Sequence, residues 1–345
     1  MSGSTGSPDS PAADGASPGV DPNATQDDRP TGSAAGIEPD GTGTRAADVA
    51  TAPTAPPSGG PTDPAERAPD AEPPAKSRAG RNLPAAIGVG VLMGAIALAS
   101  LYWRIELFLV VIVAAIVIGT DELTSAMRTR GIRLAKFPLL VGAVLMPSLG
   151  FFAGTSQVLM GFGLLFLFTI VWRLLRLGVD GFVRDATASG FVLLYAPLMG
   201  AFAALIAASP DGADRVVTFV VLSVASDIGG YAAGVLFGKH PMAPGISPKK
   251  SWEGFAGSVT FQVVLGAVLF VTLLESEWWK GAIVGAVMTV SATLGDFIES
   301  GIKRDLGIKD MSNLLPGHGG LMDRLDSIIP NTVVAYTLFA IFLGL

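Results

Sequence analysis

Apolar runs of about twenty residues recur along most of this chain, and they restrict its possible fold more than any other feature. After residue 82 these runs follow one another with only short polar connections between them. A helix needs about 20 apolar residues to cross the hydrocarbon core of a bilayer. The pattern predicts an all-α polytopic membrane protein with nine spans, at residues 83–103, 105–121, 136–153, 155–174, 188–208, 214–237, 254–274, 281–301 and 326–345.

The segment before the first run has a different composition. Residues 1–82 contain no Phe, Trp or Tyr and hold 14 of the 24 prolines. They contain 12 acidic and 6 basic residues, so this segment accounts for the whole net charge of −6. Such a segment buries too little apolar surface to offset its chain entropy. We predict a disordered acidic tail at 1–82 and a transmembrane domain at 83–345, and nothing in the charge pattern indicates nucleic-acid binding.

Lysine and arginine are distributed unevenly between the two ends of the predicted helices. The connections at one end hold 17 of these residues, and those at the other end hold only 3. Because Lys and Arg are enriched in cytoplasmic loops, the N-terminus is predicted to be cytoplasmic and the C-terminus outside. Two polar loops, 238–253 and 302–325, then lie on the cytoplasmic side, where we expect the active site.

Charged residues interrupt the eighth apolar run. At ~100° per residue, Asp296, Glu299, Ser300 and Lys303 fall on one face of a helix. Two carboxylates, a hydroxyl and an ammonium on one stripe can hold a hard cation and a phosphate together. Snorkelling charges at a helix end are the simpler alternative.

A glycine-rich turn and two further acids follow this helix, in the sequence LPGHGGLMDRLD at 315–326. Proline and three glycines around His318 predict a turn whose backbone N–H groups can approach an anion. Asp323 and Asp326 lie three residues apart at the start of the next helix, where the helix dipole favours negative charge. N-capping explains one of these acids, but not both of them together with Arg324 and His318.

A third polar region precedes the seventh run. Its hydroxyl and ammonium groups suit phosphate oxygens and belong to Ser247, Lys249, Lys250 and Ser251. The rule that places basic loops in the cytoplasm accounts for the lysines equally well. Upstream, Asp227 lies inside the sixth run, where an acid needs a partner. It is either an outer member of the site or a hydrogen-bonded structural residue.

Several kinds of chemistry are excluded. The chain has no cysteine, so it has no disulfide, thiolate metal site or cysteine nucleophile. Its two histidines, His240 and His318, leave little room for a histidine-rich zinc site. The patterns GxxxxGK[ST] and HExxH are absent, and GxSxG does not occur after residue 82.

The three polar regions together resemble the signature of phosphatidate cytidylyltransferases (CDP-diacylglycerol synthases). The resemblance covers roughly residues 85–345. Its motifs are SD at 226–227, SPKKSWEG at 247–254, GD at 295–296 and SxIKRx4KDxSx2LPxHGGx2DRxD at 300–326. One departure is Ser251, where the family usually has Thr, and this change keeps the hydroxyl.

The resemblance implies the reaction CTP + phosphatidate → CDP-diacylglycerol + pyrophosphate, dependent on Mg²⁺. It also allows a second, monovalent cation such as K⁺. The phosphate of phosphatidate is already a nucleophile, so the protein's task is to bring two polyanions together and neutralise the leaving pyrophosphate. A multi-pass homodimer in the cell (plasma) membrane, in contact with membrane lipids, is implied as well.

The resemblance also assigns roles to individual residues. The predicted metal ligands are four aspartates, Asp296, Asp323, Asp326 and Asp227. The predicted catalytic residues are three cations that bind phosphate groups, Lys303, Arg304 and Arg324. The predicted substrate-binding residues come from the two polar loops and are Ser247, Lys249, Lys250, Ser251, His318, Gly319 and Gly320.

Other functions stay open at this point. An ion-coupled transporter would use Asp227 and Asp296 as a cation path and would not consume CTP. Charges gathered near one face rather than at the midplane argue against it. A membrane scaffold leaves the 316–326 segment unexplained. Within the enzyme class, the alternative is cytidylyl transfer to another lipid phosphate, such as a polyprenyl or isoprenoid-ether acceptor.

Overall fold

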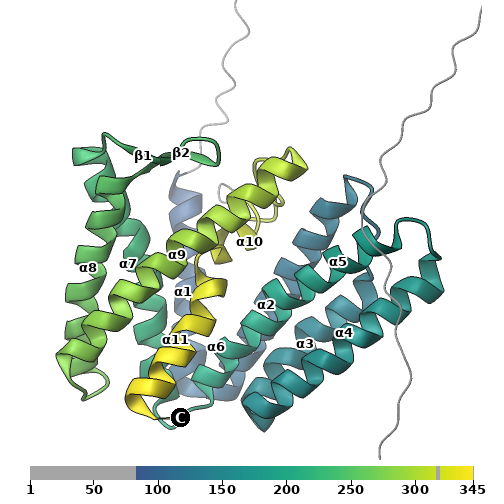
Figure 1. The fold of residues 1–345 in the computed structure, drawn as a ribbon. Coiled ribbons are helices and arrows are strands. Elements are labelled where there is room, and N and C mark those ends of the chain that lie inside the picture. The colour runs from purple at the N-terminus through teal and green to yellow at the C-terminus, as the bar shows by residue number, and fades with distance from the viewer. Residues whose placement is uncertain (1–82, 316–318, 345) are drawn as a thin grey trace, which may run out of the picture. The chain divides into compact units, whose positions relative to one another are not determined.

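The computed structural model describes residues 83–315 and 319–344, and these residues are almost entirely helical. The predicted tail at 1–82 and His318 lie outside the described residues. The elements in Figure 1 are α1 (Leu83–Trp103), α2 (Ile105–Arg128), α3 (Lys136–Ala153), α4 (Thr155–Leu177), α5 (Phe182–Leu193), the π-helix η1 (Leu194–Leu198), α6 (Met199–Ala207), α7 (Gly212–Phe237), β1 (Pro241–Ala243), β2 (Ser247–Ser251), α8 (Trp252–Thr272), α9 (Trp278–Leu306), α10 (Met322–Leu325) and α11 (Ile328–Leu343).

The helices match the predicted membrane spans closely. Within the described residues, 8 helical stretches are long and apolar enough to cross a membrane, and a shorter one, Gly90–Trp103, lies in α1. The all-α polytopic class is therefore confirmed, while the total of nine spans stays a prediction. The predicted end of the second span at 121 was too early. Helix α2 continues to Arg128 because Leu123, Ala126 and Met127 are buried against the rest of the bundle.

Many large apolar side chains lie on the outside of the helices. On α4, for example, Leu164 is 70% and Leu175 is 77% exposed. A soluble protein rarely exposes a continuous apolar surface of this kind. Acyl chains solvate it instead, which agrees with a membrane-embedded bundle.

Helices α8 and α9 approach each other through glycines. A Cβ atom at Gly281 would lie 2.1 Å from the carbonyl oxygen of Gly266, and one at Gly285 would lie 2.1 Å from that of Gln262. Small residues spaced four apart allow such close contact between membrane helices. The contact holds α9 firmly against α8, and α8 begins directly after β2.

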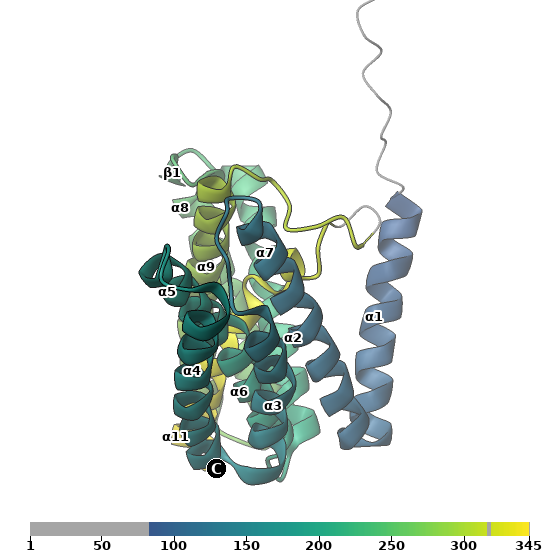
Figure 2. The same ribbon diagram turned by 90° about the vertical axis from the view of Figure 1, so that its right-hand side faces the viewer.

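Strands β1 and β2 form an antiparallel hairpin at one end of the bundle. Figures 1 and 2 show this hairpin and the C-terminal end of α9 at one end, and the C-terminus of the chain at the other. The sequence predicted a loop here rather than strands. The hairpin is anchored by Glu253, whose carboxylate accepts the backbone N–H groups of Lys239 (3.1 Å) and His240 (3.2 Å).

A buried ion pair joins α4 to α5. Arg173 and Asp185 are both 0% exposed, and Arg173 Nη2 lies 2.6 Å from Asp185 Oδ2. Arg173 also donates to the carbonyl oxygens of Gly178 and Asp180, each at 2.8 Å. Arg184 Nε donates to the second oxygen of Asp185 at 3.0 Å. These contacts close the connection between the two helices with the buried charges satisfied.

Candidate functional site

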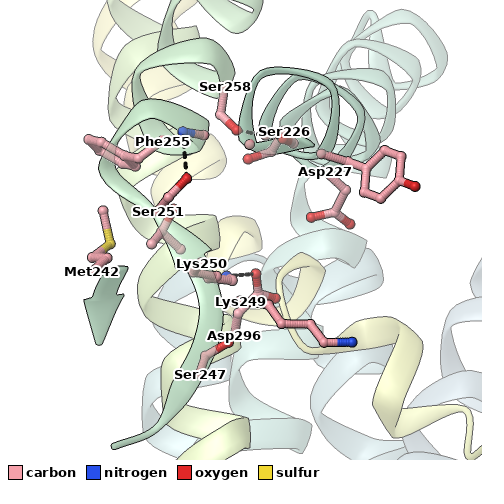
Figure 3. A pocket seen from close by; sticks show the side chains of 15 residues that line it. Ser226, Asp227, Met242, Ser247, Lys249, Lys250, Ser251, Phe255, Ser258 and Asp296 are labelled. Atoms are coloured by element: carbon pink, nitrogen blue, oxygen red, sulfur yellow. Dashed lines mark hydrogen bonds and ion pairs between the residues drawn. The ribbon is translucent and has the colours of Figure 1, made fainter. Parts of the chain in front are cut away.

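A cavity of about 420 Å³ lies between α7, the hairpin, α8 and α9. Most of the residues predicted for substrate and metal binding in the first polar loop and the helices beside it line this cavity, namely Asp227, Ser247, Lys249, Lys250, Ser251 and Asp296. Lys250 reaches from β2 to Asp296 and forms an ion pair with it, and Asp227 approaches from α7 (Figure 3). Tyr231 and Phe255 give the cavity an apolar part.

A second cavity of about 420 Å³ adjoins the first. The two have Asp227, Lys250 and Asp296 in common. The remaining wall of the second cavity comes mainly from polar residues of α9, α10 and the turn after α10, which are Ser300, Asp323, Arg324, Asp326 and Ser327. The structure therefore brings the two polar regions, far apart in sequence, to one junction.

The polar stripe of α9 is divided between the cavity and the protein interior. Asp296 and Ser300 line the second cavity. Glu299 is 0% exposed and turns inward. Lys303 Nζ lies 3.1 Å from Glu299 Oε1 and 3.0 Å from Asp323 Oδ1. Lys303 thus connects α9 to the segment that carries Asp323.

Asp323 holds the glycine turn that precedes it. Its Oδ2 atom accepts the backbone N–H groups of Met311 (2.9 Å) and Gly320 (2.8 Å). Gly319 has φ +81°, and a Cβ atom on it would lie 3.0 Å from Asp323 Oδ2. A side chain at either position would disturb the turn, because a Cβ atom on Gly320 would lie 2.7 Å from Glu122 Oε2. The structure therefore favours glycine at both positions.

Glu122 on α2 binds the same turn from the other side, a contact that the sequence analysis did not predict. It is 6% exposed. Its Oε1 atom accepts hydrogen bonds from the hydroxyl of Ser312 (2.6 Å) and the backbone N–H of Leu321 (3.0 Å). Its Oε2 atom accepts a hydrogen bond from the backbone N–H of Met322 (2.7 Å). The only available signal was an acid directly after an apolar run, which is common at helix ends. Glu122 and Asp323 together fix the 311–322 segment.

The other predicted residues are placed differently. Ser251 caps α8, and its Oγ atom accepts the N–H of Gly254 at 3.1 Å. Arg324 lines the second cavity, whereas Arg304 is exposed on α9 and lines neither cavity. The predicted role of His318 lies outside the described residues.

The acids of the second cavity have the chemistry of a hard-cation site. All four predicted metal ligands line it and offer the oxygen donors that Mg²⁺ prefers. The positive charge beside Asp296 and Asp323 in this structure comes from Lys250 and Lys303. Across residues 83–315 and 319–344, no three acidic or histidine side chains are already gathered as a metal-binding group. The donor chemistry fits a cation, and the two lysines supply the balancing charge.

Known proteins are similar to this chain over the region that holds both cavities. Residues 84–342 match the model of the cytidylyltransferase family. The chain is 42% identical over 280 residues to the phosphatidate cytidylyltransferase of Mycobacterium leprae, covering 76% of this chain and 89% of that protein. It is 40% identical over 272 residues to that of Mycobacterium bovis, covering 75% and 89% respectively. The matched region contains every described residue of both cavities.

Proposed function

Because the chain belongs to the cytidylyltransferase family, we propose that it transfers the cytidylyl group of CTP to phosphatidate. The products are CDP-diacylglycerol, a precursor in phospholipid biosynthesis, and pyrophosphate. One observation carries the proposal: two adjoining cavities share a lysine and two aspartates at their junction, at the end of a membrane-embedded bundle. This arrangement gives two anionic substrates separate places next to common charged groups.

The chemistry requires positioning rather than a protein nucleophile. An oxygen of the phosphatidate phosphate attacks the α-phosphorus of CTP, and the bond to the β-phosphate breaks as pyrophosphate leaves. Lys250 lies where both anions meet and offsets their mutual repulsion. Ser247 and Lys249 provide donors in the first cavity, and Arg324 provides them in the second. Fixed charges of this kind accelerate phosphoryl transfer by orientation and electrostatic stabilisation.

The proposal includes Mg²⁺, with Asp296 and Asp323 as its ligands and Asp227 and Asp326 beside them. When bound, the cation would neutralise charge that develops on the pyrophosphate. A second, monovalent cation such as K⁺ belongs to the same proposal. Both cations are supported by the carboxylate oxygen atoms that line the second cavity.

The orientation and assembly of the protein are also part of the proposal. We propose that the cavities face the cytoplasm, where CTP is found, and that the protein is a homodimer in the cell membrane. The excess of Lys and Arg at the same end, 17 against 3, supports this orientation. Accessibility of single cysteines introduced on either side of the membrane tests the orientation, and light scattering of the purified protein tests the dimer.

A direct assay tests the reaction. Purified protein is incubated with labelled CTP, Mg²⁺ and either phosphatidate or a polyprenyl phosphate. We expect labelled CDP-diacylglycerol and pyrophosphate with phosphatidate only. Product with polyprenyl phosphate alone would assign a different acceptor. Ion flux into vesicles without consumption of CTP would support the transporter hypothesis and contradict the proposed cytidylyltransferase activity.

Replacing Glu122 by glutamine is expected to lower kcat by about 10- to 100-fold, the range for residues that position the binding residues without contacting the substrate themselves. The Glu122 carboxylate accepts three hydrogen bonds from the 311–322 segment. A glutamine has an N–H₂ group in place of one carboxylate oxygen and cannot accept there, so at least one of these hydrogen bonds is lost. The measurement is kcat and KM for CTP, together with hydrogen exchange of residues 310–322.

Asp121→Asn is the matched control, because Asp121 is the preceding residue and pairs with Lys136 at an exposed position. An exposed pair of this kind contributes little, so kcat should change by less than about threefold. Equal effects of the two substitutions, or unchanged exchange of residues 310–322 in Glu122→Gln, would contradict a positioning role for Glu122.

A further inference from the structure

A third cavity, of about 380 Å³, lies away from the two described above and has a basic lining. It is formed by the end of α2, the following connection, the start of α3 and the end of α4. Its polar residues are Thr124, Ser125, Arg128, Arg133 and Lys136, and its apolar ones are Leu134 and Leu177. It has no lining residue in common with the catalytic cavities. None of the described residues that line it is acidic.

The side chains of the two arginines in this basic pocket are exposed, whereas the backbone N–H of Arg133 contacts the buried Asp185. Among the residues that the structure describes, neither the Arg128 nor the Arg133 side chain has a hydrogen-bond, ion-pair or ring partner. Arg130, between them in sequence, behaves differently: its Nε atom donates to the carbonyl oxygen of Leu306 at 2.8 Å. Lys136 pairs with Asp121 at 2.5 Å. The enrichment of Lys and Arg in cytoplasmic loops explains why several basic residues occur in this connection. It does not explain why Arg128, Arg133 and Lys136 line the same pocket.

The surroundings of the pocket are those of a membrane surface. Phe137, next to Lys136, stacks on Trp172 with ring centroids 4.9 Å apart. The guanidinium of Arg176 lies 4.8 Å from the centre of the Trp172 ring. Aromatic rings at helix ends mark the level of the lipid headgroups. A phosphate held by Arg128 and Arg133 would therefore lie at headgroup depth, above the apolar side chains of Leu134 and Leu177.

We propose that this basic pocket binds the phosphate of an anionic phospholipid. The arginines suit a phosphate because each offers a fork of N–H donors. Basic pockets between membrane helices are a known way to recognise such headgroups. The lipid would also stabilise the 129–135 connection, which Arg130 links to the C-terminal end of the catalytic helix α9. The site stands independently of the proposed reaction.

The test uses the full-length protein in nanodiscs of dioleoylphosphatidylcholine with added dioleoylphosphatidylglycerol. The latter is neither substrate nor product of the proposed reaction, so its retention does not report on the catalytic cavities. Native mass spectrometry counts the lipids that stay bound after release. We expect the Arg128→Gln/Arg133→Gln variant to bind phosphatidylglycerol on the order of thirtyfold more weakly than the wild type.

Lys76→Gln/Arg78→Gln is the matched control, because it removes the same charge from residues that precede α1 in the sequence. It should retain phosphatidylglycerol like the wild type. In the wild-type protein, hydrogen exchange of residues 124–136 should slow on adding phosphatidylglycerol, a readout that does not depend on the folding of any variant.

Three results would overturn the proposal. One is equal retention by the wild type and the Arg128→Gln/Arg133→Gln variant, and another is exchange of residues 124–136 that does not respond to the lipid. The third is equal protection by millimolar inorganic phosphate in detergent, which would assign the pocket to a free anion instead of a lipid headgroup.

Discussion

Replacing Asp296 by asparagine is expected to lower turnover by about a thousandfold or more. Asp296 lines the first and second cavities and pairs with Lys250, so its charge lies where the two substrates are proposed to meet. If Asp296 holds a cation as proposed, its replacement removes several kcal/mol of transition-state stabilisation, and each ~1.4 kcal/mol is tenfold in rate. The measurement is CDP-diacylglycerol formation at saturating CTP and phosphatidate, over a range of Mg²⁺ concentrations.

Asp305→Asn is the control, because Asp305 lies on the same helix but is exposed and lines neither cavity. We expect its turnover to stay within about twofold of the wild type, as for other exposed charges. Asp323→Asn should also reduce activity, but it breaks contacts with Met311 and Gly320 and therefore tests structure and chemistry together. Wild-type turnover of a well-folded Asp296→Asn protein would refute the role given to this residue.

Replacing Arg173 by methionine is expected to destabilise the protein by about 3–5 kcal/mol, the usual effect of removing one partner of a buried ion pair. Asp185 would stay buried and would keep Arg184 and the backbone N–H of Arg133, and the carbonyl oxygens of Gly178 and Asp180 would lose their donor. The measurement is the midpoint of thermal unfolding in detergent, followed by the fluorescence of the tryptophans.

Two further variants separate this effect from a simple loss of charge. Arg176→Met removes an exposed arginine one turn away, whose guanidinium lies over Trp172, and should cost less than about 1 kcal/mol. Arg173→Met/Asp185→Leu replaces both charges by apolar groups and should recover part of the loss. A midpoint for Arg173→Met equal to that of Arg176→Met would contradict the stabilising role of the buried pair.

The sequence was sufficient to predict what depends on local composition. The run at 136–153 became α3 with the same bounds, and the runs at 155–174 and 214–237 lie within α4 and α7. An apolar run of membrane length has few alternatives to a helix, because lipid offers no partner for backbone groups. The spacing of Asp296 and Ser300 likewise placed both on one face, and both line a cavity.

Contacts between distant segments could not be predicted in this way. Glu122 is 190 residues from Ser312 in sequence, and Arg173 is, by sequence alone, one of many cations near the helix ends. Neither belongs to a periodic pattern, so their partners become visible only when the helices are packed. The same limit applies to Glu299, which shares the predicted stripe of α9 but turns into the interior.

The first and second cavities share a wall formed by Asp227, Lys250 and Asp296. If each cavity accepts one reactant, neither has to wait for the other, and binding can occur in either order. A blocking compound confined to one cavity would then compete with one reactant and not with the other. A compound that bridges the wall would compete with both.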